Sequence, residues 1–218
     1  MTHTATSPDV DILMVGHMAV ERIVVDGHSE AATGGGVFYG SMALRRLGMD
    51  VAVATRLHPR DYPRLDEMRR AGVRVYPTAA DATSGIENIY SSENMERRVC
   101  HPLAFAGAFQ PEDVPEIAAK VIMISPIIAG EVDLPLLKTL ADRAPLALDV
   151  QGFVRVPDGD SLVFRPWPDM AQGLARVTYL KVDLAEAEHL TGLTDAAKAA
   201  ARLAAYGPRE VVVTRSEG

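Results

Sequence analysis

Short apolar runs alternate with stretches of helical periodicity along most of the chain. Val10–Val15 predicts a buried strand that ends at Gly16, and Val37–Leu47 predicts a helix that ends before Gly48. Further strands are predicted at Val51–Thr55, Val73–Tyr76, Val121–Ile124, Leu146–Val150, Val177–Leu180 and Glu210–Thr214, and further helices at Arg64–Ala71, Leu134–Asp142, Leu184–Leu190 and Ala196–Tyr206. Successive strand–helix–strand units predict an α/β fold with a parallel sheet and covering helices.

Two segments interrupt this alternation with the pattern of β-hairpins. Each has two short strands around a polar turn, at Asp26-Gly27-His28 in the first segment and at Ser92-Glu93-Asn94 in the second. The strands of the second hairpin are Ile86–Tyr90 and Arg97–His101, and another β excursion is predicted at Phe153–Phe164. We expect one domain over residues 1–218, with the two hairpins near 21–33 and 85–101 forming a small separate sheet.

The composition excludes several classes of protein. The chain has 218 residues, with 22 Lys and Arg against 29 Asp and Glu, so its formal charge of −7 argues against a nucleic-acid partner. No segment reaches the roughly 18 unbroken apolar residues of a membrane span. Met1–Asp9 is polar, so we expect a cytoplasmic protein with no membrane partner. Cys100 is the single cysteine, which excludes an internal disulfide framework.

Three consecutive glycines, Gly34, Gly35 and Gly36, stand directly before the first predicted helix. Backbone N–H groups at such a helix start suit an anion or a hydroxyl-rich ligand held close to the chain. With Gly40 the pattern also permits a dinucleotide interpretation, although the segment before it, His28–Thr33, is polar rather than a buried strand. A tight turn without a ligand is the third interpretation.

The order of these motifs resembles the ribokinase-like (PfkB) carbohydrate kinases. An acid, Glu21, is followed by a hairpin, the glycine turn with Gly40, and a helix that ends in Arg45-Arg46-Leu47-Gly48. Much later, the segment from Leu180 to Gly192 resembles the family's N-x-x-E motif, and Gly207–Thr214 resembles the strand before its nucleotide site. Asp149–Arg155 is similar to the subset related to inositol and nucleoside kinases.

The resemblance implies a doubly wound, mostly parallel sheet with helices on both faces and a small β lid. It also implies transfer of the γ-phosphoryl group of ATP, with Mg²⁺, to a hydroxyl of a sugar, nucleoside or cyclitol. Lid closure would keep water away from the reacting hydroxyl. A homodimer formed through the lid is the assembly that we consider.

Five residues match the family's substrate site. Glu21 stands where the family normally carries Asp, so its carboxylate must reach differently. Gly34, Gly35 and Gly36 match the substrate turn. Tyr39 replaces a sugar-binding Asn, which exchanges a two-sided amide for a flat ring with one hydroxyl and argues against ribose. Strand-end charge for Glu21 and helix packing for Tyr39 are the alternative structural roles.

Three residues match the family's nucleotide side. Asp183 and Glu186 occupy the N-x-x-E positions, with Asp in place of Asn, and Thr214 ends the last strand. At positions i and i+3 near a helix start, the two carboxylates share one face and could orient hydrated Mg²⁺, with Glu186 nearest the metal. Acids at a helix N-terminus are also favoured by the helix dipole alone.

The family's catalytic turn, a G-A-G-D segment that supplies the general base and the anion hole, has no match in these 218 residues. We therefore assign no catalytic residue, and we expect the chain to lack the C-terminal catalytic segment and to be impaired in transfer. One alternative is a non-catalytic sugar-binding or regulatory protein of the same fold. A remote one is an NAD(P)-dependent oxidoreductase. The pair Arg97-Arg98 beside the second turn is either a solvated stem or a substrate contact.

Overall fold

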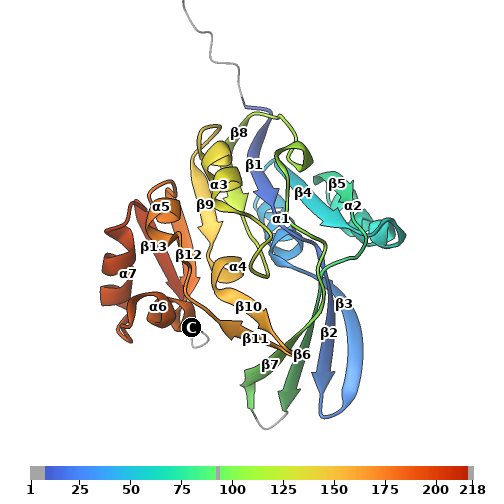
Figure 1. The fold of residues 1–218 in the computed structure, drawn as a ribbon. Helices are drawn as coiled ribbons and strands as arrows, with labels where there is room; N and C mark the ends of the chain where they lie inside the picture. Colours follow the sequence, from blue (N-terminus) through green and yellow to red (C-terminus); the bar gives the residue numbers. More distant parts are fainter. Residues whose placement is uncertain (1–7, 92–93, 216–218) are drawn as a thin grey trace, which may run out of the picture.

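Seven parallel strands form the centre of the molecule (Figure 1). The computed structural model describes residues 8–91 and 94–215, with side chains for 8–90 and 99–215. The central strands are β1 Val10–Val15, β4 Val51–Leu57, β5 Arg74–Ala79, β8 Ala119–Ile124, β9 Leu146–Asp149, β12 Tyr179–Asp183 and β13 Glu210–Thr214, in the order β13-β12-β9-β8-β1-β4-β5. Their apolar runs form strands because a parallel sheet buries residues on both faces.

The strand order reverses beside β1. The chain first builds outward through β4 and β5, then returns to place β8 on the other side of β1 and continues through β9, β12 and β13. The carboxyl ends of β1 and β8 therefore flank a topological switch point, where open α/β sheets bind their ligands. This order confirms the predicted doubly wound sheet.

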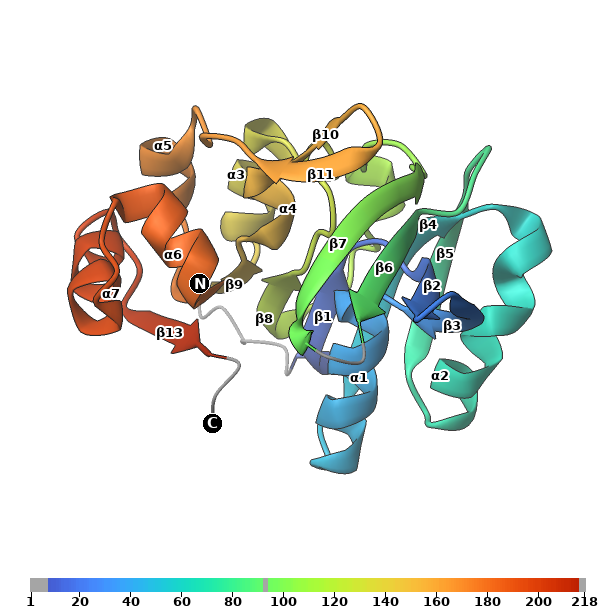
Figure 2. The same cartoon turned by 90° about the horizontal axis from the view of Figure 1, so that it is seen from below.

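Helices cover the sheet from two sides (Figure 2). The helices that cover it are α1 Gly36–Arg46, α2 Asp66–Arg70, α3 Leu134–Ala141, α5 Met170–Leu174, α6 Leu184–Thr191 and α7 Ala196–Ala204. Val37 of α1 and Met68 of α2 pack with Met14 and Val53 against one face. Residues of α3, α5, α6 and α7 pack against the other face, in a larger core that runs from β4 to β13. No helix in the described part of the chain is long and apolar enough to cross a bilayer.

The two hairpins join into one small sheet, called the lid below, with the order β3-β2-β6-β7, which extends away from the central sheet (Figure 1). Its strands are β2 Ala19–Val25, β3 His28–Gly34, β6 Gly85–Ser91 and β7 Asn94–Ala104. Asp26 and Gly27 have φ angles of 47° and 82°, the left-handed pair that a two-residue hairpin turn requires. Ser92 and Glu93 of the second turn, and the side chains of Arg97 and Arg98, lie outside the described residues.

A third hairpin links the two parts of the molecule. β10 Arg155–Asp158 and β11 Ser161–Phe164 form a two-stranded antiparallel sheet, which the short helix α4 Gln151–Val154 joins to β9. Leu162 of this hairpin packs with Ile86 of the lid and with Ile127 and Ile128. In Figure 2 the hairpin lies across the molecule between α4 and β7.

Local details differ from the sequence-based expectation at three places. The predicted helix Arg64–Ala71 forms only in part, as the single-turn α2, and its first two residues belong to a 3₁₀ segment, Pro59–Leu65, in which Pro63 lacks the backbone N–H that a longer α-helix would use. Helices α4 and α5 were not predicted. Both are four or five residues long and each contains a glycine, so neither carries a periodic apolar pattern.

We predict that Gly16→Ala destabilises the fold by about 1–3 kcal/mol. A Cβ at this position would overlap the backbone carbonyl of Ser125, which belongs to the chain that follows β8 and cannot move alone. Gly40→Ala is the matched control, because its Cβ would meet only the terminal methyl of Met14, a flexible group, and alanine favours the helix. Denaturant unfolding of both variants measures the difference; equal stability would contradict the prediction.

Candidate functional site

The glycine turn lies on the two loops that leave the switch point. Gly34 ends β3, Gly35 caps α1 with φ 92°, and Gly36 starts the helix. A Cβ on Gly35 would lie 2.6 Å from the carbonyl oxygen of His17, and one on Gly36 would overlap the hydroxyl of Ser125. Gly35 has both a positive φ and a direct backbone contact, so glycine is required there, whereas Gly36 packs closely on the Ser125 side chain after β8.

Glu21 of β2 reaches back to this turn. Its Oε1 accepts a hydrogen bond from the Gly35 N–H at 3.2 Å, and its Oε2 accepts one from the Tyr39 hydroxyl at 3.3 Å. Tyr39 is 52% exposed. Partial burial, together with the nearby Glu21 carboxylate, raises the pKa of the Tyr39 hydroxyl. The structure therefore brings all five predicted substrate residues together; their role in binding remains a prediction.

Asp183 and Glu186 form a capping box at the start of α6. The Asp183 N–H donates to Glu186 Oε2 at 2.8 Å, and the Glu186 N–H donates to Asp183 Oδ1 at 2.7 Å. This exchange satisfies two backbone donors at the helix start, so each acid has a structural role. Thr214 pairs with Asp183 in the register of β12 and β13. All three predicted cofactor residues therefore lie at the carboxyl ends of these two strands.

The second oxygen of Glu186 has no hydrogen-bond donor among the described residues. Glu186 is fully buried, and its Oε1 accepts no hydrogen bond from any described residue. Burial raises the pKa of the Glu186 carboxyl, and the neighbouring Asp183 charge contributes in the same direction. Burying a carboxylate oxygen without a hydrogen-bond donor costs folding free energy. This oxygen is therefore suited to contact a bound cation or a hydrogen-bond donor of a ligand.

Arg155 of β10 lies beside the acid pair and was not among the predicted site residues. One guanidinium nitrogen is 4.0 Å from Asp183 Oδ2 and 3.9 Å from Glu186 Oε1, and the side chain is 13% exposed. The two distances exceed hydrogen-bond length, so the arginine balances charge without closing the site. The signal in the sequence was the Asp149–Arg155 segment, whose resemblance to inositol kinases does not itself show which neighbours the arginine meets.

A chain of contacts through the loop after β8 connects the glycine turn with Arg155, which lies beside the acid pair. Ile127 packs beside Gly35, and its carbonyl accepts a hydrogen bond from Gln151 Nε2 of α4 at 3.4 Å. Two residues further on, the Ala129 N–H donates to the Arg155 carbonyl at 2.8 Å. Because all central strands run parallel, both groups lie at the carboxyl edge of the sheet, where such folds hold their ligands.

The carboxylates at the carboxyl ends of these strands fit a hydrated divalent cation rather than a metal ion that is fully enclosed by side chains. No group of three metal-ligating side chains occurs among the described residues. Glu186 Oε1 and the outer oxygen of Asp183 are the carboxylate atoms left outside the capping box, and Mg²⁺ typically takes one or two carboxylates and keeps its waters. When bound, such a cation would neutralise charge on donor phosphates.

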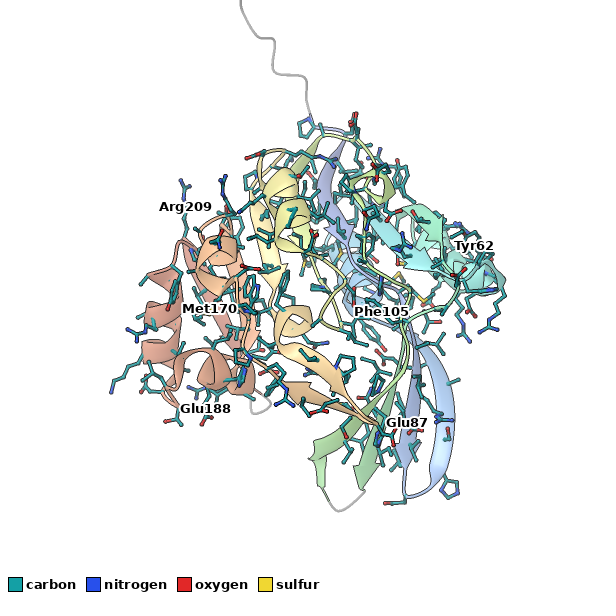
Figure 3. All side chains as sticks on the ribbon, viewed as in Figure 1. Tyr62, Glu87, Phe105, Met170, Glu188 and Arg209 are labelled. Carbon is teal, nitrogen blue, oxygen red and sulfur yellow. The ribbon has the colours of Figure 1, made fainter. Side chains whose placement is uncertain are left out.

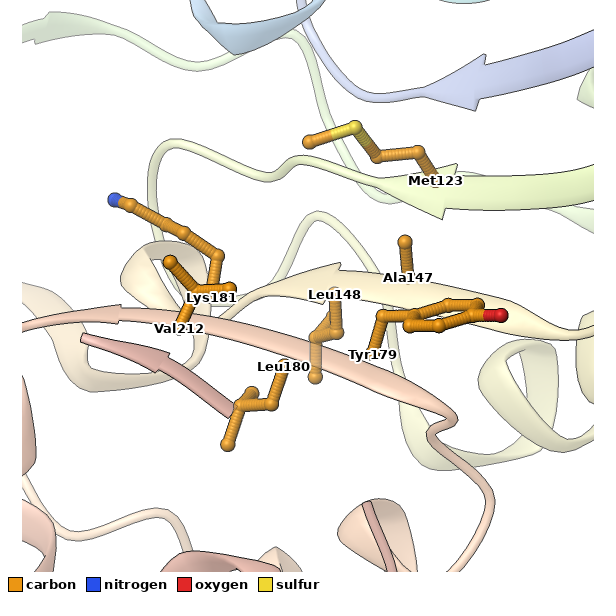
Figure 4. Close-up of a pocket in the computed structure, with 7 residues that line it drawn as sticks. All are labelled: Met123, Ala147, Leu148, Tyr179, Leu180, Lys181 and Val212. Carbon is orange, nitrogen blue, oxygen red and sulfur yellow. The ribbon is translucent and has the colours of Figure 1, made fainter. Parts of the chain in front are cut away.

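An apolar pocket elsewhere does not belong to this site. It is lined by Met123, Ala147, Leu148, Tyr179, Leu180, Lys181 and Val212 (Figure 4). It lies on the part of the sheet formed by β8, β9, β12 and β13, where Tyr179 and Val212 are exposed. The Lys181 ammonium is paired with Asp149 at 3.2 Å. Nothing in this lining matches a predicted site residue.

The glycine turn also follows a strand of the lid rather than a buried strand of the central sheet. The first central strand, β1, is followed by the segment Gly16-His17-Met18, in which Gly16 is the single glycine. A dinucleotide fingerprint requires its glycines between a buried strand and a helix. This arrangement therefore does not support the NAD(P) interpretation.

Comparison with known proteins shows the family. The chain matches the pfkB family of carbohydrate kinases over residues 21–217, and it belongs to that family. A pyrophosphate-dependent kinase in the ribokinase family, solved with a pyrophosphate analog and myo-inositol, is 32% identical with a TM-score of 0.88, covering 94% of this chain and 73% of the other. Comparison with curated proteins finds no match.

Two further structures are similar to this chain to different degrees. A pyrophosphate-dependent myo-inositol-1 kinase that was converted into a myo-inositol-3 kinase is 31% identical with a TM-score of 0.87, covering 95% of this chain and 72% of the other. Arabidopsis thaliana ribokinase with ribose and ATP is 16% identical with a TM-score of 0.69 and the same coverage of 95% and 72%. The latter shows the fold alone.

The raised pKa of Glu186 predicts a pH-dependent difference in stability. Because the folded pKa lies above the ordinary value of 4.5, the protonated carboxyl stabilises the fold fully below pH 4.5, and this stabilisation is lost as pH rises through the folded pKa. Glu186→Gln imitates the protonated form. We expect its free energy of unfolding to exceed that of the wild type at pH 7, with the gap closing toward pH 4.

Glu188→Gln is the matched control, because Glu188 is exposed on the same helix and is visible at its surface in Figure 3. Urea unfolding across the pH range should give wild-type behaviour for this control. A Glu186→Gln variant that is less stable than the wild type at pH 7 would show that the carboxylate is already well compensated in the folded chain.

Proposed function

We propose that this chain binds a cyclitol, with myo-inositol as the first candidate, and serves in phosphoryl transfer to one of its hydroxyls. The observation that carries the proposal is the glycine turn held by Glu21 at the switch point of the sheet. The 31–32% identical structures support the choice of acceptor, since they are described with myo-inositol or as myo-inositol kinases.

The acceptor site supplies complementary groups for a ring with many hydroxyls. The Glu21 carboxylate accepts hydrogen bonds, and its contacts with Gly35 and Tyr39 are long enough to be exchanged for ligand hydroxyls. Tyr39 offers a flat, half-exposed ring that can lie along one face of a cyclitol. Because the turn has no side chains, a ring can approach the backbone N–H groups directly.

For the phosphoryl donor we propose inorganic pyrophosphate with Mg²⁺, in place of the ATP expected from the family at large. The support is that the structures at 31–32% identity are pyrophosphate-dependent, whereas the ribokinase with ATP is 16% identical. Arg155 would contact the donor phosphates, while Asp183 and Glu186 would hold the cation. Thr214, at the end of β13, lines the same edge.

Transfer itself needs a general base, and these 218 residues contain no G-A-G-D turn to supply one. A polypeptide of only these residues should therefore bind the acceptor but transfer phosphoryl slowly, because a base contributes roughly 10²–10⁴-fold. A non-catalytic binding protein is the second candidate function, since the acceptor groups at the glycine turn do not depend on a catalytic segment. A cytoplasmic location and a dimer through the lid remain predictions.

Titration calorimetry tests the acceptor. We expect myo-inositol to bind the 218-residue chain, with ribose and nucleosides at least tenfold weaker, and Glu21→Ala to abolish the heat of binding. Glu30→Ala, on the exposed strand of the same hairpin, is the control. Binding of ribose or a nucleoside in preference to every cyclitol would overturn the assignment. A coupled assay with pyrophosphate or ATP separates the two candidate functions, since rapid turnover excludes the non-catalytic one.

Arg155→Met should weaken pyrophosphate–Mg²⁺ binding at least tenfold and leave myo-inositol binding unchanged, because only the donor side loses a cation. Arg165→Met is the matched control: Arg165 follows the same hairpin but pairs with Asp158 at the surface. Calorimetry with each ligand measures both effects. Equal losses in the two variants, or a loss of acceptor binding in Arg155→Met, would exclude a specific role for Arg155 in donor binding.

A further inference from the structure

A buried carboxylate, Glu131, joins the two loops that flank the switch point. Its Oε1 accepts hydrogen bonds from the backbone N–H groups of Ile127 at 2.6 Å and Ile128 at 2.9 Å, in the loop after β8. Its Oε2 accepts one from the His17 N–H at 3.1 Å, in the loop after β1. Glu131 is fully buried and both of its oxygens accept backbone hydrogen bonds, so neither oxygen is available to a ligand.

These two loops are the surface on which the glycine turn is built. Gly35 packs against the His17 carbonyl and the side chain of Ile127, and Gly36 packs against Ser125. The carboxylate of Glu131 therefore holds together both supports of the turn. A change of a few tenths of an ångström between the loops would move Gly35 relative to Glu21 and disturb the acceptor groups, since binding geometry must be held to within about 0.5 Å.

The same cluster also meets the chain segments that lead into and out of the lid. His17 Nδ1 lies 2.7 Å from the Ser84 hydroxyl, just before β6, and this hydroxyl accepts a hydrogen bond from the Ala106 N–H, just after β7, at 3.0 Å. The Ser84 carbonyl accepts one from the Val20 N–H of β2 at 2.9 Å. Glu131, His17 and Ser84 thus form a buried polar group at the base of the lid.

Aromatic rings close this group off from water. The His17 ring stacks on Phe109 at 5.2 Å and meets the edge of Phe105 at 5.5 Å, and Figure 3 shows Phe105 where the lid strands join the central sheet. Burial lowers the pKa of His17, so its ring is neutral at pH 7. In such surroundings the hydrogen bonds to a carboxylate are strong and a missing partner is costly.

We propose that Glu131 is a positioning residue for the acceptor: it fixes the spacing of the loops after β1 and β8, and thereby places the glycine turn and the base of the lid for polyol binding. This role rests on the proposed function. Glu131 lies in the loop before α3, on the acceptor side of the contacts described above, so acceptor binding should depend on it far more than donor binding.

Glu131→Gln is the test, because it keeps the shape but one of its two acceptor atoms becomes an NH₂ donor. The remaining oxygen can still serve Ile127 and Ile128, and the NH₂ group then opposes the His17 N–H. We expect hydrogen exchange at the His17 amide to accelerate at least tenfold, myo-inositol to bind at least tenfold more weakly, and pyrophosphate–Mg²⁺ binding to remain within twofold of the wild type.

Asp133→Asn is the matched control. Asp133 accepts a hydrogen bond from the Leu136 N–H at the start of α3, two residues from Glu131, but does not bridge the loops. It should leave both ligands within twofold. Ser84→Ala is a milder second variant, should Glu131→Gln not fold, and it should weaken acceptor binding about threefold while leaving donor binding unchanged.

The outcomes separate this role from the proposed function. A wild-type chain that binds no polyol overturns the proposed function, and this role with it. A wild-type chain that binds myo-inositol, together with a Glu131→Gln variant that binds it equally well, overturns only the role of Glu131. Parallel weakening of acceptor and donor binding in that variant also overturns the role, since it indicates general loss of structure. Selective loss of acceptor binding supports it.

Discussion

The close approach of a side-chain-free turn to two backbone segments is the constraint on which the site depends. Gly35 and Gly36 lie against the His17 carbonyl and Ser125, and this contact is possible only because the central strands β1 and β8 end side by side at the reversal of strand order. The sheet topology, the start of α1 and the position of Glu21 all meet there. The turn itself consists of backbone, which has no alternative rotamers, and the Glu21 side chain contacts it at Gly35.

The acid pair at the start of α6 combines two requirements in one motif. Each carboxylate gives one oxygen to the helix start, and the burial that makes this capping box strong leaves Glu186 Oε1 without a donor. The Arg155 guanidinium balances part of the negative charge of the acid pair, but at 3.9 Å it forms no hydrogen bond with Glu186 Oε1. The two residues that stabilise the start of the helix therefore also provide a carboxylate oxygen that has no hydrogen-bond donor.

Sequence patterns predicted the parts of the molecule that local chemistry decides. The buried strands follow from apolar runs and the lid hairpins from their polar turns, while the grouping of Glu21 with the glycine turn followed from the family resemblance. Contacts between distant segments were not predictable in this way: His17 meets Glu131 across 114 positions, and Ser84 meets His17 across 67. Glu131 belongs to no recognised motif, and the segment that ends in Arg155 does not show which groups the arginine faces, because only the fold determines those neighbours.

The β10–β11 hairpin has its own consequence. Its first residue, Arg155, lies beside the acid pair, while its far end contacts the lid through the hydrogen bond between the Asp160 carbonyl and the His101 ring and through the packing of Leu162 against Ile86. Outward movement of the lid would either break these contacts with the β10–β11 hairpin or move the hairpin with it. The lid and the acid pair are therefore linked by this hairpin, and a form of the protein with the lid moved outward would differ at both places.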